Sequence, residues 1–150
     1  MAKIVLTDVF ATFQALDFSV TPPVGVGTVY DLSDHISSVA LSTVHTIVET
    51  TEVGQTYKRV IAGLGTNSVQ FEFYQDFDNS SVEDVFYPWI ATRVLCRIRP
   101  TSDPISTTNP EYRFQTLISE WQPLNAGVGG LSTVQVQWPI NGPITKDTTP

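Results

Sequence analysis

Alternation between apolar and polar residues predicts that most of the chain forms β-strands. The clearest case is residues 69–73, where Val69, Phe71 and Phe73 share one face, and Gln70 and Glu72 share the other. A period of two is typical of a strand with one buried face. The same period recurs in residues 93–99, 112–121 and 132–138. We therefore expect these segments to be half-buried strands.

The longest strand-like run covers residues 36–51 and is rich in Val, Thr and Ile. These β-branched residues favour strands over helices. Val39 and Leu41 fall on one face of this run, whereas Val44 and Val48 fall on the other. The change of side predicts a bulge or a switch of the apolar face near the middle of the run.

One short stretch has the pattern of a helix. Ser80 and Ser81 are both suitable N-cap residues, and Glu83 or Asp84 follows at the spacing of a capping box. Pro88 then limits the helix to about two turns. We expect a single short helix between the strands.

The predicted fold class is mainly β, because strands precede and follow the single helix. This order indicates a β-sandwich or β-barrel with the helix against one side. The length predicts one domain over residues 1–150. Within it, residues 1–27 are expected to be an N-terminal arm and loop, in which Met1–Phe18 is either a strand or an extended arm. Residues 141–150 are expected to be a polar C-terminal tail.

The charge balance argues against a protein that binds nucleic acid through its phosphates. The chain has 15 acidic and 8 basic residues, with a formal net charge of -7, and only 15% of its residues are charged. No surplus of Lys and Arg is present to release counterions from DNA. Uncharged polar residues fill the strands instead, and such faces suit contacts with other protein chains.

Few residues offer catalytic or metal-binding chemistry. His35 and His45 have no spacing of a zinc motif, and the single cysteine, Cys96, lies in an apolar alternating run. Neither Gly25-Val26-Gly27 nor Gly127-Val128-Gly129-Gly130 continues into a phosphate-binding motif. We therefore predict that the protein is not an enzyme and has no cofactor, catalytic residues or metal site.

Assembly with other copies of the chain fits the pattern better. Long strands with free edges promote association, and pairing those edges satisfies many backbone groups at once. We expect edge strands at Val69–Phe73, Val94–Ile98 and Val134–Trp138, and a polar, charged hairpin at Glu49–Gly65.

The chain resembles the major tail tube proteins of long-tailed, siphovirus-like bacteriophages between about Tyr30 and Gly142. No single segment carries the resemblance, which depends on the order and spacing of several. These segments are Val29–Val39, Glu49–Gly54 with Tyr57-Lys58-Arg59 and Ile61–Leu64 behind it, Val69–Phe77, Pro88-Trp89, Arg97–Ser102, Thr107–Tyr112 and Val134–Pro139.

The resemblance implies a β-sandwich whose copies form homohexameric rings, and rings that stack into a tube through which DNA is delivered. It implies that the Glu49–Gly65 hairpin reaches the neighbouring ring. The hairpin residues expected to make this contact are Glu49, Thr50, Thr51, Glu52, Gln55, Tyr57, Lys58 and Arg59.

Further residues are candidates for the lumen or for contacts between subunits. Gln70 and Glu72 on their alternating strand are candidates for the lumen, where acidic groups would repel phosphate. Arg93, Arg97 and Arg99 lie together on one face of another strand. We expect these arginines to form ion pairs between subunits.

The resemblance also implies partners and a location. Beside copies of itself, the chain would meet tape measure, terminator and distal tail proteins, and DNA would pass without sequence recognition. The protein would be part of the virion tail, assembled in the cytoplasm of the host bacterium, with no membrane contact. The alternatives are a capsid decoration protein, a head–tail terminator ring protein, or a soluble β-sandwich module that binds carbohydrate.

Overall fold

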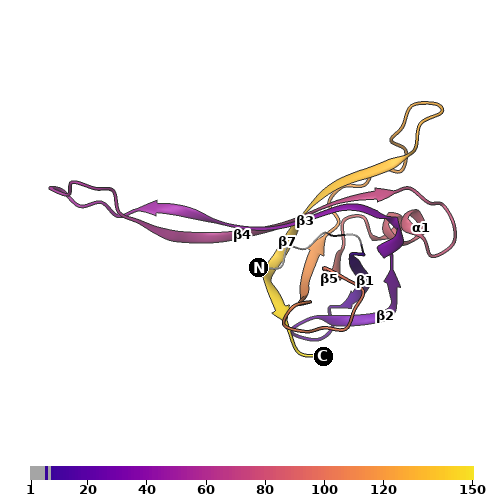
Figure 1. The fold of residues 1–150 in the computed structure, drawn as a ribbon, viewed down its shortest axis with the longest axis horizontal. Coiled ribbons are helices and arrows are strands. Elements are labelled where there is room, and N and C mark those ends of the chain that lie inside the picture. The colour runs from indigo at the N-terminus through magenta and orange to yellow at the C-terminus, as the bar shows by residue number, and fades with distance from the viewer. Residues whose placement is uncertain (1–5, 7) are drawn as a thin grey trace.

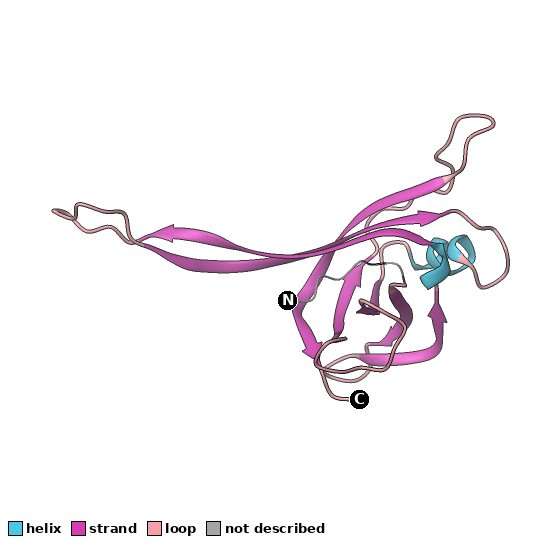
Figure 2. Cartoon of the chain, viewed as in Figure 1, coloured by secondary structure: helices cyan, strands magenta, loops and turns pink. Residues whose placement is uncertain are grey.

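The computed structural model describes residue 6 and residues 8–150, which form a mainly antiparallel β structure with one short α-helix (Figures 1 and 2). The strands are β1 (Phe10–Asp17), β2 (Val24–Asp31), β3 (Ile36–Glu49), β4 (Val60–Tyr74), β5 (Arg93–Arg99), β6 (Glu111–Leu117) and β7 (Thr133–Asp147). The helix is α1 (Val82–Phe86), and the 3-10 turns are η1 (Ser33–His35) and η2 (Tyr87–Trp89). The predicted fold class is confirmed.

The strands form one sheet in the order β2-β1-β5-β6-β7-β4-β3, folded so that its two parts face each other. The sheet bends from one layer to the other within β7. Its first half pairs with β4 through Pro139, and its second half pairs with β6 from Ile140 onward. Gly142 lies just beyond this change of partner, where the register between β6 and β7 shifts, and has a φ of 88°, a conformation that favours glycine.

Aromatic side chains fill the space between the two layers. Phe13 from β1 lies edge-on to Phe71 and Phe86, with ring centroids 5.6 and 4.9 Å away. Phe71 stacks on Phe73 at 5.2 Å, and Trp138 lies 5.4 Å from Phe86. All five rings are almost completely buried. The alternating residues of β4 and β7 therefore face the core as predicted.

Two of the three predicted edge strands are wrong. Residues 69–73 of β4 and 94–98 of β5 are paired with a strand on both sides. Residues 134–138 of β7 pair with β4 on one side, and in the described chain no strand pairs with their other side, because β6 pairs with β7 only from Ile140 onward. β2 and β3 are the edge strands instead. The sequence shows which face of a strand is apolar, but the neighbours of a strand depend on pairing between distant parts of the chain.

At the N-terminal end, β1 (Phe10–Asp17) confirms the strand alternative for this part of the predicted arm, whereas the expected loop and tail both contain strands. β1 lies between β2 and β5 in the sheet, and β2 begins at Val24 within the Pro- and Gly-rich segment. At the other end, β7 continues to Asp147 through residues 141–147. The Pro and Gly residues of these two segments are compatible with strands for different reasons. β2 is an edge strand, and Gly142 lies where β7 bends. Residues 1–5 and 7 of the predicted arm lie outside the described residues.

The apolar residues of β3 change face as predicted, but no bulge lies in the middle of the strand. Pairing stays in register through Ser42 opposite Ser68 and Val44 opposite Thr66. The register shifts after His45, where Thr46 faces the residues Gly63 and Leu64 of β4. The apolar side of β3 changes because the strand leaves the core at this point.

Helix α1 uses its predicted caps only in part. Ser81 occupies the N-cap position, but its hydroxyl makes no capping hydrogen bond to the helix. The Asp84 carboxylate accepts a hydrogen bond of 2.8 Å from the Ser80 backbone N–H. In the described residues, no helix has the length and apolar character needed to cross a membrane.

Candidate assembly surfaces: the hairpin arm and the polar sheet face

The most prominent feature is a long hairpin made by the outer parts of β3 and β4, which we call the arm (residues 44–66). β4 pairs with β7 only from Ser68 to Tyr74, so beyond this stretch β3 is its only partner in the sheet. Figure 1 shows the arm extending far from the body of the molecule. The arm therefore lies outside the core.

The arm carries apolar side chains that nothing in the described part of the chain covers. Ile47 is 75% exposed and Leu64 is 85% exposed. Val44, Val48, Val60 and Ile61 are also exposed. A two-stranded hairpin alone in water is marginally stable, and a run of exposed apolar residues is typical of a protein contact surface. The arm thus has the properties of a segment that another chain covers.

The hairpin residues predicted from the sequence lie together at the end of the arm. Glu49 ends β3 and lies 3.8 Å from the ammonium of Lys58. Across the loop, the Thr50 N–H donates to the Arg59 carbonyl at 2.8 Å, and the Arg59 N–H donates to the Thr51 hydroxyl at 3.0 Å. The remaining predicted residues, Glu52, Gln55 and Tyr57, are exposed in the loop between them.

Sequence reasoning missed the apolar residues of the arm as candidates for contact. It selected the polar and charged side chains between positions 49 and 59. Ile47, Ile61 and Leu64 are more unusual, because they are apolar and yet exposed. The available signal was the change of apolar face within β3. That change marks where the strand leaves the core.

His45 has a structural place at the base of the arm. A Cβ added to Gly65, its partner on β4, would lie 2.7 Å from the imidazole ring. His45 Nδ1 lies 3.2 Å from the Gly63 carbonyl oxygen. The imidazole thus covers the glycine pair of β4, and it lies in a different part of the fold from His35.

The outer face of the β3-β4-β7 layer is polar and poor in charge. Strand pairing aligns Ala40, Gln70 and Gln137 in one row, and Ser38, Glu72 and Gln135 in the next. Gln135 donates to the Glu72 carboxylate at 3.3 Å. A third row contains Ser42, Ser68 and Pro139. These rows hold one carboxylate, no Lys and no Arg, so this face has little attraction for phosphate.

Arg93, Arg97 and Arg99 lie in β5, in the other layer, and the structure therefore separates them from Gln70 and Glu72. Arg99 lies over the ring of Phe10 at 3.9 Å, and Arg93 over Phe18 at 4.8 Å. These are cation–π distances.

Arg97 lies in a row that crosses the outer face of this second layer. It is opposite Thr12 of β1 and Arg113 of β6. Arg113 is paired with Glu111 at 2.5 Å and with Asp147 at 3.0 Å. By contrast, the Nε atoms of Arg97 and Arg99 are buried without a hydrogen-bond partner among the described residues. Two guanidinium groups of this face are thus incompletely paired.

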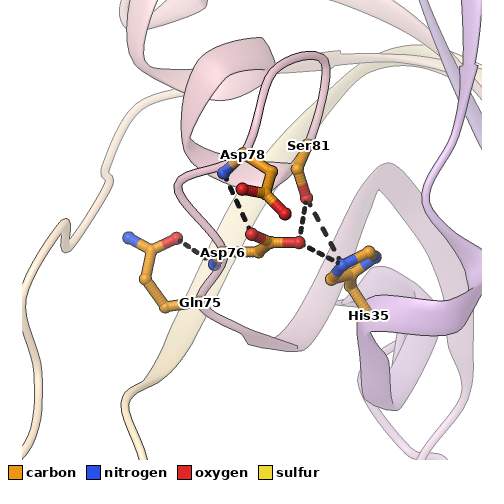
Figure 3. A network of polar contacts seen from close by, with 5 residues as sticks. All are labelled: His35, Gln75, Asp76, Asp78 and Ser81. Carbon is orange, nitrogen blue, oxygen red and sulfur yellow. Dashed lines mark hydrogen bonds and ion pairs between the residues drawn. The ribbon is translucent and has the colours of Figure 1, made fainter.

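A polar network joins turn η1 to the segment before α1 (Figure 3). His35 Nε2 lies 2.8 Å from Asp76 Oδ2, and the Ser81 hydroxyl donates to the same oxygen at 2.7 Å. The Asp78 backbone N–H donates to Asp76 Oδ1 at 3.0 Å. The Asp78 N–H, the Ser81 hydroxyl and His35 together lower the pKa of Asp76 to about 2.

The network contains Ser, His and Asp but has the wrong geometry for a catalytic triad. In a triad the two ring nitrogens of His contact the Asp and the Ser separately. Here Ser81 and Asp76 both lie at Nε2, and Nδ1 is buried without a partner among the described residues. The Ser81 hydroxyl donates to the carboxylate rather than to the imidazole. The arrangement stabilises the connection between β4 and α1.

The remaining candidates for chemistry are structural. Cys96 is completely buried in the core, and this burial raises the pKa of its thiol. Over the described residues, no group of three or more His, Cys, Asp or Glu side chains is close enough to hold a metal ion.

Solved structures of phage tail and tail-like assemblies share this fold. The SPP1 tail tube, determined by solid-state NMR and cryo-EM, matches with a TM-score of 0.66 and 12% identity, over 98% of this chain and 80% of that chain. The baseplate of the anti-feeding prophage, determined by cryo-EM with six-fold symmetry, matches with a TM-score of 0.57 and 10% identity, over 97% of this chain and 96% of that chain. No protein-family model and no curated protein sequence matches. At these identities the likeness shows a common fold.

Proposed function

We propose that the protein is a structural subunit of a phage-type tail tube. Copies associate into hexameric rings, the rings stack, and phage DNA is delivered through the lumen. The observation that carries this proposal is the arm, whose apolar side chains are exposed on a hairpin with no packing partner in the described chain. The shared fold with the SPP1 tail tube supports the same interpretation.

In this proposal, the arm of one subunit contacts the next ring. Burying Ile47, Ile61 and Leu64 against another copy would remove their exposed surface from water, which is favourable by about 25 cal/mol per Å² of apolar area. The predicted hairpin residues, including Glu52 and Tyr57, would make the outermost contacts.

The free edges of β2 and β3 are suited to pairing within a ring. Both edges present unpaired backbone groups, and a ring of subunits that pairs β2 of one copy with β3 of the next would satisfy them. In the same ring, the terminal nitrogens of Arg97 and Arg99 would form ion pairs with carboxylates of a neighbouring subunit.

The outer face of the β3-β4-β7 layer is the proposed wall of the lumen. Its aligned rows contain Gln70, Glu72 and Gln137 and no basic residue. Weak attraction for phosphate lets DNA slide, because each Lys or Arg on the path would form a salt-dependent contact.

Function in a virion tail implies further contacts. The ends of the tube would meet terminator and distal tail proteins, the lumen would hold a tape measure protein before DNA, and assembly would take place in the cytoplasm of the host bacterium. A head–tail terminator ring is the alternative within the same fold, and it would form single rings that do not stack.

A carbohydrate-binding module is less well supported. Trp138 is completely buried in the core. Trp121 donates its indole N–H to Glu83 at 2.6 Å, and Trp89 packs edge-on against Tyr30. None of the three indoles forms an open platform for stacking on a sugar.

Deleting residues 52–58 tests the proposal. The deletion removes the end of the arm and keeps the pairs from Ile47–Ala62 to Glu49–Val60. Folded subunits that no longer form tubes are the expected product, judged by negative-stain micrographs and circular dichroism. Normal tubes from the shortened protein would exclude the arm as the contact between rings.

A further inference from the structure

A second projection, separate from the arm, lies between β6 and β7 in residues 118–132. Leu124, Val128 and Leu131 are strongly exposed there, and Val128 is completely so. From Gln122 to Ser132 the loop contains no charged residue. Three exposed apolar side chains on one short neutral loop are more than the scattered single residues of an ordinary protein surface.

The base of this loop is fixed to the body. Trp121 donates its indole N–H to Glu83 at 2.6 Å, and the Gln75 side chain donates to the Pro123 carbonyl at 2.8 Å. At the other end, the Gln75 backbone N–H donates to the Ser132 carbonyl at 3.1 Å. The loop therefore presents its apolar residues from a defined position.

The loop and the arm point in opposite directions along the molecule. β4 begins in the arm at Val60 and ends at Tyr74, beside the start of β7 where the loop joins. A strand of 15 residues is roughly 50 Å long. Figure 1 shows the arm at one end of the long axis, and the loop, in orange to yellow, projecting at the other.

Two different apolar surfaces at opposite ends of one molecule favour contact from head to tail. Such a contact repeats along an axis without closing, and so builds a filament. Within the end of the arm, the loop of residues 50–57 carries one charged residue, Glu52, and exposes Val53 and Tyr57; Glu49, Lys58 and Arg59 flank it. Because the loop is neutral, no repulsion between like charges opposes the contact.

A groove of about 490 Å³ is another apolar surface on which the arm of a second copy could dock. It lies between the layers, lined by residues that include Leu41, Ile98 and Ile144. Leu41 and Thr43 place this groove where the arm leaves the body. A copy that approaches along the axis from the opposite end meets the loop before it meets this groove.

We infer that residues 122–131 are the surface on which the arm of the next copy docks, with Val53 and Tyr57 against Leu124, Val128 and Leu131. This inference rests on the proposed function, since it specifies the partner of the arm in a stacked tube. The occupant is a second copy of this chain.

Cross-linking between two single-site variants tests the contact. Val53→Cys and Val128→Cys proteins, carrying tags of different size, are mixed under conditions of tube assembly and treated with a short bismaleimide. Cys96 does not interfere because it is completely buried. Neighbours in a tube have an effective concentration of about a millimolar, so the cross-linked pair should exceed that from unassembled protein by on the order of tenfold or more.

Thr107→Cys serves as the matched control, because Thr107 is exposed in the distant loop between β5 and β6. Val53→Cys should link to Val128→Cys and not to Thr107→Cys. Tubes in which Val53→Cys links equally to both sites would overturn the docking surface and leave the proposed function standing. Absence of tubes from the unmodified protein would overturn both.

Discussion

Val48 lies directly opposite Ile61 in the β3–β4 pair, and both side chains are about half exposed although both are apolar. In a folded body such a cross-strand pair would be covered by a second layer. On the arm, no second layer in the described part of the chain covers this pair.

Replacing Ile47 and Ile61 by Thr should prevent tube formation without unfolding the protein. Thr keeps the β-branched shape that strands favour and removes the apolar contact. We expect the free energy of unfolding to change by less than about 0.5 kcal/mol per site, as for exposed positions in general. Sedimentation velocity and thermal unfolding measure the two effects. The exposed loop residue Val20 offers a matched change, Val20→Thr, which should still form tubes.

Removing Phe86 should destabilise the body strongly. Its ring lies 4.9 Å from Phe13 and 5.0 Å from Trp121, and it is completely buried. Phe86→Ala leaves a cavity that neighbouring rings fill only in part, so the expected loss is about 3–5 kcal/mol in a urea titration. Phe77→Ala, at a strongly exposed ring, should cost far less. Equal losses would contradict the central place of Phe86 in the core.

Asp76 should make stability depend on pH in acid. The pKa of its carboxyl is about 2 in the folded protein and has an ordinary value of 3.8. As pH falls, the unfolded chain therefore takes up this proton first, and the folded state loses a contribution that is fully present above about pH 4. The loss should be complete only below the folded-state pKa of about 2.

The variant Asp76→Asn isolates this contribution. The difference in unfolding midpoint between the native protein and Asp76→Asn should be constant at neutral pH and shrink between about pH 4 and pH 2. A difference that stays constant down to pH 2 would show that the contacts to Asp76 do not favour its ionised form.

Adding positive charge to the outer face of the β3-β4-β7 layer should make tubes retain DNA. Gln70 and Gln137 are direct neighbours there, so Gln70→Lys with Gln137→Lys places two ammonium groups side by side. We expect short duplex DNA to co-sediment with these tubes and to be released by salt. Thr107→Lys with Thr108→Lys, on an exposed loop, adds the same charge elsewhere. Equal retention by both variants would contradict a lumen lined by Gln70.

Local features of the fold could be predicted from the sequence. Val69, Phe71 and Phe73 alternate with polar residues, and all three are buried. The position of α1 followed from Ser81, Asp84 and Pro88, since capping residues and proline act over a few residues. Each of these signals depends on near neighbours in the chain, which the sequence displays directly.

Pairing between distant strands could not be predicted in the same way. The edge position of β2 and β3 depends on how all seven strands are ordered. Residues 141–150 were expected to be a polar tail, whereas β7 continues to Asp147 after it passes from β4 to β6. A Gly or Pro residue at a bend within a strand and one at the end of a strand have the same local sequence pattern.

Some of the residues predicted for assembly surfaces lie together in the structure, and others lie in different layers. The hairpin residues from Glu49 to Arg59 gather at the end of the arm, as their closeness in sequence suggested. Gln70 and Glu72 lie in one layer and Arg93, Arg97 and Arg99 in the other. Alternation assigns each residue to a face of its own strand, but it does not relate the faces of two strands.

Electron micrographs of the purified protein at high concentration test the central claim most directly. The account predicts rings that stack into tubes of constant diameter with an open lumen. Subunits that remain monomeric, as judged by micrographs and sedimentation at the same concentration, would contradict it.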